Sequence, residues 1–120
     1  METIQTLKAN WQRFAERNTG YFKKYSLETV KALTQIENGQ AANFLAWKCR
    51  IRFQIARKDE IENRFKDPYA MDIDAFTETE ELIEMLGEVV FDLHDQMVAK
   101  DLMKPVDHQA LWDEMCVGSN

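Results

Sequence analysis

Five acidic side chains recur every three or four residues in the second half of the chain: Glu81, Glu84, Glu88, Asp92 and Asp95. On an α-helix this spacing places all five along one face, with neighbours about 4.5 to 6 Å apart along the axis. Like charges at this spacing repel one another, so the row is stabilised only where cations meet it. Four interpretations follow: a solvated face, a surface that docks basic groups, a set of divalent-metal ligands, or an imitation of a phosphate backbone.

The helix that would carry this row runs from about residue 77 to residue 100. Its other face is apolar, with Leu82, Leu86, Val89, Val90, Leu93 and Met97 at helical spacing. Thr77 followed by Glu80 has the pattern of a capping box, which predicts that the helix begins there. One side of this helix therefore faces a core, and the other carries carboxylates.

Two helices are predicted before it. Ile4, Leu7, Trp11 and Phe14 have the spacing of a buried helical stripe, in a helix that ends near Asn18–Gly20, and a second stripe contains Phe22, Tyr25, Leu33 and Ile36. The second helix is expected to stop at Asn38–Gly39, since Gly readily ends helices. The alternative is one long helix that continues through Gly39.

Residues 45–55 fit two patterns. Leu45, Trp47, Cys49, Ile51, Phe53 and Ile55 alternate with more polar residues as in a half-buried strand, which could form a short hairpin from residues 47–55 and 69–75. Trp47, Ile51 and Ile55 also fit a helical stripe, and the flanking segments are rich in helix-forming residues. We favour the helix and keep the hairpin as the alternative.

A short last helix is predicted after Lys104–Pro105, with Asp107 as its N-cap and Val106 and Leu111 as a hydrophobic staple. Residues 117–120 are expected to form a frayed tail. With 120 residues, only four Gly and two Pro, the composition favours helix over a turn-rich β fold. We expect a single all-α domain over residues 1–120, built as a small bundle of four to five helices.

Charge is divided unevenly along the chain. Residues 1–58 hold eleven Lys and Arg against four Asp and Glu, whereas residues 59–120 hold four against seventeen. Complementary halves can pair within one subunit, join two copies into a homodimer, or recruit separate partners. The cations near Trp47 and Phe53 scatter around a helix, and the acidic half opposes a polyanion, so direct nucleic-acid binding is not expected.

Neither the cysteines nor the histidines form a catalytic pattern. Cys49 and Cys116 are far apart and outside any Cys-x-x-Cys pair, which predicts reduced thiols. His94 and His108 have no partner at a characteristic spacing and are interpreted as structural or surface residues. No cofactor is predicted from these residues.

A metal-dependent alternative comes from a resemblance. Leu86-Gly-Glu-Val-Val-Phe91 resembles the second metal-bearing helix of the all-α MazG-like nucleotide pyrophosphohydrolases, and the segment from Ala110 to Met115 with Ser119-Asn120 resembles their C-terminal segment. The resemblance implies Mg²⁺ ligands at Asp59, Glu62, Glu84 and Glu88 and release of pyrophosphate from nucleoside triphosphates. The sequence departs from that family where basic residues of segment 50–58 replace a run of Glu, and where Met85 replaces a Glu.

The favoured hypothesis is a non-enzymatic regulator or inhibitor that presents the acidic helix face to a basic surface of a protein partner. A self-associating structural protein is a further alternative. No apolar run approaches the roughly 20 residues needed to cross a bilayer, and the first residues lack the layout of a signal peptide. We therefore expect a cytoplasmic protein that does not act at a membrane.

Overall fold

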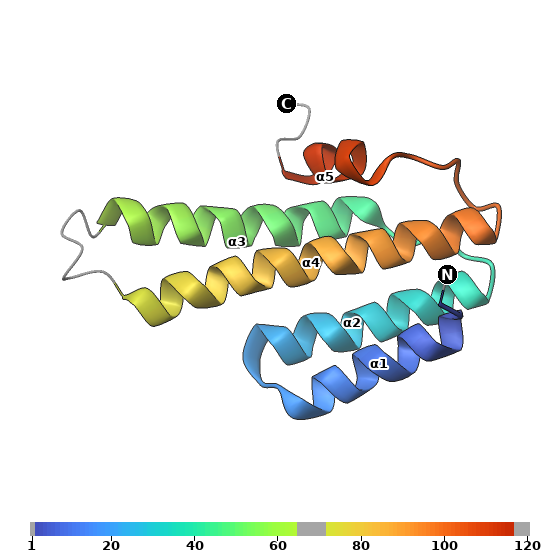
Figure 1. The fold of residues 1–120 in the computed structure, drawn as a ribbon, viewed down its shortest axis with the longest axis horizontal. Helices are drawn as coiled ribbons and strands as arrows, with labels where there is room; N and C mark the ends of the chain where they lie inside the picture. Colours follow the sequence, from blue (N-terminus) through green and yellow to red (C-terminus); the bar gives the residue numbers. More distant parts are fainter. Residues whose placement is uncertain (1, 65–71, 117–120) are drawn as a thin grey trace.

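The computed structural model describes residues 2–64 and 72–116, and these residues form five α-helices and no strand (Figure 1). The helices are α1 (Ile4–Arg17), α2 (Gly20–Glu37), α3 (Phe44–Arg64), α4 (Ile73–Ala99) and α5 (His108–Cys116). The predicted all-α fold is confirmed. The predicted tail at residues 117–120 lies outside the described residues.

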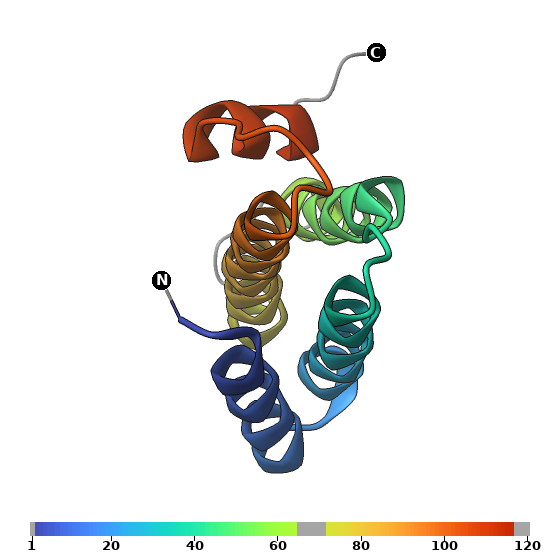
Figure 2. The same ribbon diagram turned by 90° about the vertical axis from the view of Figure 1, so that its right-hand side faces the viewer.

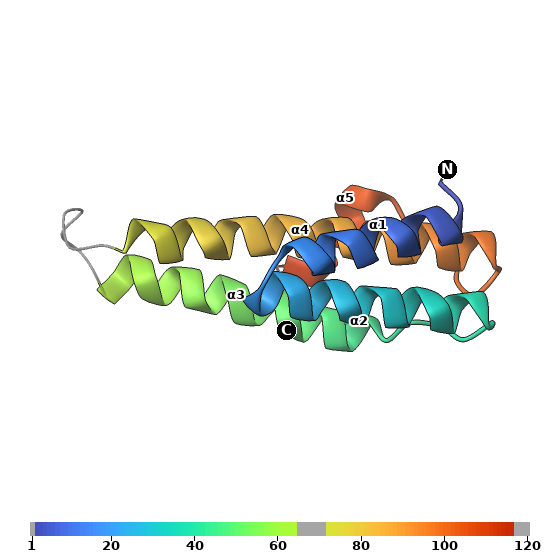
Figure 3. The ribbon, with the colours of Figure 1, turned by 90° about the horizontal axis from the view of Figure 1, so that it is seen from below.

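The bundle is made of two antiparallel helix pairs and one added helix. In the end view of Figure 2, α4 and α1 lie on one side, α3 and α2 lie on the other, and α5 covers the end formed by α3 and α4. The α3–α4 pair is longer than the α1–α2 pair and extends past it at one end, as Figure 3 shows from below. The strongest packing is within each pair, and α2 also packs closely on α4. Contacts between α1 and α4 are sparser, which leaves room for a groove between them.

The core is centred on α4. All six apolar residues predicted for its inner face are at most 2% exposed: Leu82, Leu86, Val89, Val90, Leu93 and Met97. They pack against buried side chains from every other helix, which include Leu33 and Ile36 of α2 and Leu111 of α5. Each such residue contributes about 1.5–3 kcal/mol through burial, so this face fixes the orientation of the acidic face behind it.

The predicted alternative of a hairpin from residues 47–55 and 69–75 is wrong over its described part. Residues 47–55 lie in α3, where Trp47 and Ile51 are buried but Leu45 and Phe53 are exposed. The alternating pattern therefore does not distinguish buried from exposed residues in this segment. Helical spacing does, because it places the polar residue Gln54 on the buried face with Trp47 and Ile51. Residues 69–71 lie outside the described part of the chain.

The structure contradicts the predicted start of the acidic helix and confirms the predicted end of the second helix. Helix α4 begins four residues before Thr77, because the Asp72 carboxylate accepts a hydrogen bond from the Ala75 amide (3.0 Å) and caps the helix there. The predicted capping box at Thr77 is thus wrong. The predicted stop at Gly39 is confirmed: Gly39 adopts a positive φ of 83°, and the Gln40 amide bonds back to the Gln35 carbonyl (2.8 Å).

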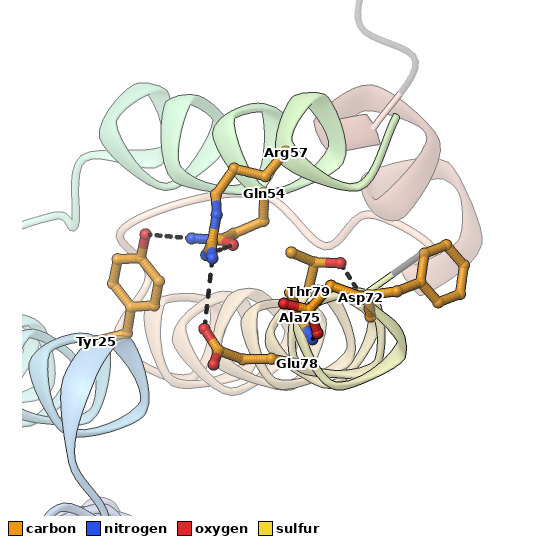
Figure 4. Close-up of polar contacts among 8 residues, drawn as sticks. Tyr25, Gln54, Arg57, Asp72, Ala75, Glu78 and Thr79 are labelled. Carbon is orange, nitrogen blue, oxygen red and sulfur yellow. Dashed lines mark hydrogen bonds and ion pairs between the residues drawn. The ribbon is translucent and has the colours of Figure 1, made fainter. Parts of the chain in front are cut away.

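A chain of polar contacts, buried at its Tyr25–Gln54 end, connects three helices (Figure 4). The Gln54 amide donates to the Tyr25 hydroxyl (3.1 Å), and Arg57 donates to the other end of the Gln54 side chain (2.8 Å). Arg57 also forms an ion pair with Glu78 (3.5 Å). This chain fixes the register of α2 and α4 against α3.

Candidate binding site

The outer face of α4 carries the acidic row as predicted. Glu81, Glu84 and Glu88 are exposed, and none of them forms an ion pair or hydrogen bond with a residue in the described ranges. We call these three residues the acidic ridge. Asp92 and Asp95 continue the same stripe toward the C-terminus of α4 but are only partly exposed. The row is therefore one continuous stripe whose first three members face solvent.

Asp92 is tied to α1. Its Oδ2 accepts a hydrogen bond from the indole Nε1–H of Trp11 (3.1 Å). Burial raises the pKa of the Asp92 carboxyl, and the indole donor offsets this effect only in part. The contact links α1 to α4 beside the groove that both residues line.

Asp95 is tied to the segment that leads into α5. One of its oxygens accepts hydrogen bonds from His94 Nδ1 (2.8 Å) and His108 Nε2 (2.9 Å). Partial burial acts to raise the pKa of Asp95, but the hydrogen bonds from His108 and His94 outweigh it and leave the pKa lowered. Asp95 is thus an ionised acceptor that holds α4 and α5 together rather than an open binding group.

His94, Asp95 and His108 are close enough for three ligand atoms to approach one metal ion. The hydrogen bonds argue against such a site. His94 Nε2 accepts from the Val106 amide (3.0 Å), so the proton of the neutral ring must be on Nδ1, the atom that faces Asp95. A metal at Nδ1 would move this proton to Nε2, against the Val106 N–H. Only Asp95 and His108 remain as ligands, which is fewer than the three protein ligands typical of a catalytic zinc site.

The metal-binding arrangement implied by the resemblance is not formed. The ion pairs Arg57–Glu78 and Lys58–Glu80 set the register of α3 against α4. In this register Asp59 and Glu84 are separated by about 10 Å along the helix axes, and Glu62 and Glu88 by about 20 Å. Among the described residues, the only group of three or more potential ligands is the histidine and aspartate group above. The structure therefore does not bring the four carboxylates together.

A groove runs between α1 and α4, with a volume of about 480 Å³. Its floor includes the apolar side chains of Leu7, Trp11, Phe22 and Met85, and the polar residues Glu2, Asn10 and Asp92 also line the groove. One wall is the acidic ridge, and the opposite wall carries Phe14 of α1, whose side chain is 36% exposed. The volume falls within the range of roughly 300–1,000 Å³ typical of ligand clefts.

A second groove, lined by residues of α4 and α5, also borders the ridge. Phe91 stacks on His108 there (4.4 Å between ring centroids), and Trp112 packs directly over Gly87. Glu84 and Glu88 line both grooves. This part of the acidic ridge therefore has an apolar surface on either side.

Within residues 2–64 and 72–116, no ion pair joins the basic half of the chain to the acidic ridge. Ion pairs of that half with other acids are Lys8–Glu37, Arg50–Glu28, Arg57–Glu78 and Lys58–Glu80. Complementary charges within the subunit thus meet at the α1–α2, α2–α3 and α3–α4 contacts. The acidic ridge stays available to cations from outside.

Sequence reasoning missed the α1 wall of the groove. The spacing of Ile4, Leu7, Trp11 and Phe14 predicts a buried stripe, yet Phe14 is among the exposed large apolar residues. No sequence signal marks this difference, because it arises from the separation of α1 from α4.

Both cysteine thiols are free, and burial raises the pKa of Cys116 to about 11, which suppresses the reactive thiolate.

Comparisons of the chain with protein-family models, with characterised proteins and with solved structures found no match. No helix in the described part of the chain has both the length and the apolar content needed to span a bilayer.

Proposed function

We propose that the protein is a binding module that captures a basic segment of a protein partner on the acidic ridge of α4, and that it acts as a regulator or inhibitor by occupying that segment. The observation that carries the proposal is the state of Glu81, Glu84 and Glu88. These three carboxylates are aligned, exposed and without a cation among the described residues. The three carboxylates repel one another, and binding of a cation reduces this repulsion.

The rigidity of the ridge supports this role. The opposite face of α4 is the most buried surface of the bundle, so the carboxylates are held in a fixed line rather than on a loop. A fixed line of charge gives electrostatic complementarity to a partner whose cations have the same spacing. It also accelerates encounter with such a partner in a salt-dependent way.

Binding is favoured over catalysis by the contacts of the titratable groups. The hydrogen bonds of His94 and His108 go to Asp95 and to the Val106 backbone, and neither imidazole contacts a hydroxyl or thiol among the described residues. A nucleophile activated by a histidine base would require such a contact.

The test compares two charge reversals with the same change in net charge. Glu84→Lys/Glu88→Lys inverts the ridge, while Asp59→Lys/Glu62→Lys inverts two exposed acids on α3. Binding of a fluorescent Lys- and Arg-rich helical peptide is measured by anisotropy at low and at physiological salt. We expect the wild type and the α3 variant to bind, with affinity falling as salt rises, and the ridge variant to lose binding. Equal losses in both variants would show that only net charge matters and would contradict the proposal.

A further inference from the structure

We propose that the groove between α1 and α4 binds an amphipathic α-helix of the partner, with the apolar face of that helix on the groove floor and its cationic edge along the acidic ridge. This inference rests on the proposed function and adds the shape and chemistry of the bound segment. A second copy of this chain and a disordered polycation are the competing occupants.

Charge alone gives too little affinity. Exposed ion pairs contribute about 0.2–1 kcal/mol each, so three of them form only a weak and salt-sensitive complex. Stable binding requires a central apolar contact next to the charges. The groove supplies that contact directly beside the ridge, because Glu84 and Glu88 line it together with Trp11 and Phe14.

The apolar side of the groove is a connected aromatic surface. Trp11 and Phe14 meet edge to face (5.8 Å between centroids), and Phe14 lies 6.4 Å from Phe22 in a similar arrangement. Trp11 is buried and fixed by its bond to Asp92, whereas Phe14 keeps a substantial exposed area. An incoming apolar side chain would therefore find a rigid floor and would cover Phe14, as a helix-in-groove complex requires.

The ridge specifies where the cations of the ligand must lie. From Glu81 to Glu88 it spans seven residues, or about 10 Å along the axis of α4. A partner helix lying alongside would meet it with Lys or Arg at positions i, i+3 or i+4, and i+7, which share one edge of a helix. The apolar residues of the ligand would occupy the adjacent face.

A helix suits this site better than an extended strand. The described groove walls are helices, whose backbone groups are already hydrogen-bonded, so the site offers no edge to which a strand could add. A nucleic acid would bring phosphates against the acidic ridge. A disordered polycation would leave the aromatic floor uncovered.

The experiment uses three peptides and two matched pairs of variants. The first peptide is a helix with apolar residues on one face and Lys or Arg on one edge. The second contains the same residues in scrambled order, and the third carries Glu in place of each cation. Phe14→Ala removes the groove wall, while Phe53→Ala removes an exposed phenylalanine of α3 that does not line the groove. The charge reversals described above complete the set, and circular dichroism checks the fold of each variant.

We expect the amphipathic peptide to bind the wild type at least about tenfold more tightly than the scrambled peptide, and Phe14→Ala to weaken its binding by about the same factor. Phe53→Ala should leave binding unchanged. Amide chemical-shift changes in the wild-type protein should cluster on α1 and α4, a readout that requires no substitution.

The other outcomes separate the two proposals. If scrambled and amphipathic peptides bind equally and Phe14→Ala has no effect, the groove is not the site and this inference is overturned, although the ridge still attracts cations. If no cationic peptide binds, the proposed function fails as well. If the protein instead self-associates through the groove, as shown by sedimentation and by loss of the dimer in Phe14→Ala, the occupant is a second copy and the inference is also overturned.

Discussion

The buried pair Tyr25 and Gln54 gives the sharpest test of how the α1–α2 pair is held in place. Gln54 is fully buried and Tyr25 is 3% exposed, so water cannot replace either partner of their hydrogen bond. Burial also raises the pKa of Tyr25, which keeps its hydroxyl protonated. Since α2 packs extensively on α1, this bond also helps to set the position of the groove wall.

Each single substitution leaves a polar group of this bond without its partner. Tyr25→Phe strands the Gln54 amide, and Gln54→Leu strands the Tyr25 hydroxyl, at a cost of about 1–3 kcal/mol in each case. Gln54→Leu also removes the acceptor of the Arg57 hydrogen bond. The double variant removes both polar groups of the Tyr25–Gln54 bond, and the loss of the Arg57 hydrogen bond is common to it and to Gln54→Leu, so that loss cancels in the cycle. We therefore expect it to be less destabilised than the sum of the two single variants, with a coupling of at least about 1 kcal/mol.

The assay is urea unfolding followed by circular dichroism for the wild type, both single variants and the double variant, analysed as a double-mutant cycle. Thermal unfolding should show a loss of about 4 °C for each kcal/mol. Additive losses, or single variants within about 0.5 kcal/mol of the wild type, would refute the reasoning that this bond is buried and dry.

Two further predictions concern the neighbours of the ridge. Asp92→Asn should stabilise the protein at neutral pH by about 0.5 kcal/mol, because the carboxyl whose pKa burial raises is costly when ionised there and repels Glu88, while Asn still accepts from Trp11. The gain should vanish as the pH falls through the raised pKa of Asp92, and destabilisation at neutral pH would contradict the account. Gly87→Val should release α5, because a Cβ at this position would lie 2.9 Å from the Trp112 ring, and overpacking costs about 1–3 kcal/mol. Hydrogen exchange should then accelerate in residues 108–116 but not in the core of α4, and unchanged protection of α5 would count against this packing argument.

Periodicity predicted much of the fold because burial follows it closely. The apolar face of α4 is buried residue by residue as its spacing indicates, and Gly39 ends α2 because it can adopt a positive φ. In α3 the spacing left two interpretations open, because strict alternation resembled a strand while Trp47, Ile51 and Ile55 fitted a helix, and the favoured helix is confirmed. The deciding residue there was Gln54, whose burial depends on a hydrogen-bond partner 29 positions away that no local pattern shows.

The candidate site was predicted only in part. The acidic row was found because it lies on one helix, so its geometry follows from spacing alone. The groove beside it depends on the separation of α1 from α4. Asp92 and Asp95 are engaged in hydrogen bonds with Trp11 of α1 and His108 of α5, which lie far from them in the sequence. Such contacts between distant segments are set by tertiary packing, which one sequence does not reveal.

A charge-swap experiment tests the central claim most directly. The wild type and Glu84→Lys/Glu88→Lys are each titrated with the cationic amphipathic peptide and with its counterpart that carries Glu in place of each cation. If the ridge of α4 is the recognition surface, the wild type should bind only the cationic peptide, and the variant should bind only the acidic one. Continued preference of the variant for the cationic peptide, or binding of neither peptide by either protein, would contradict the account.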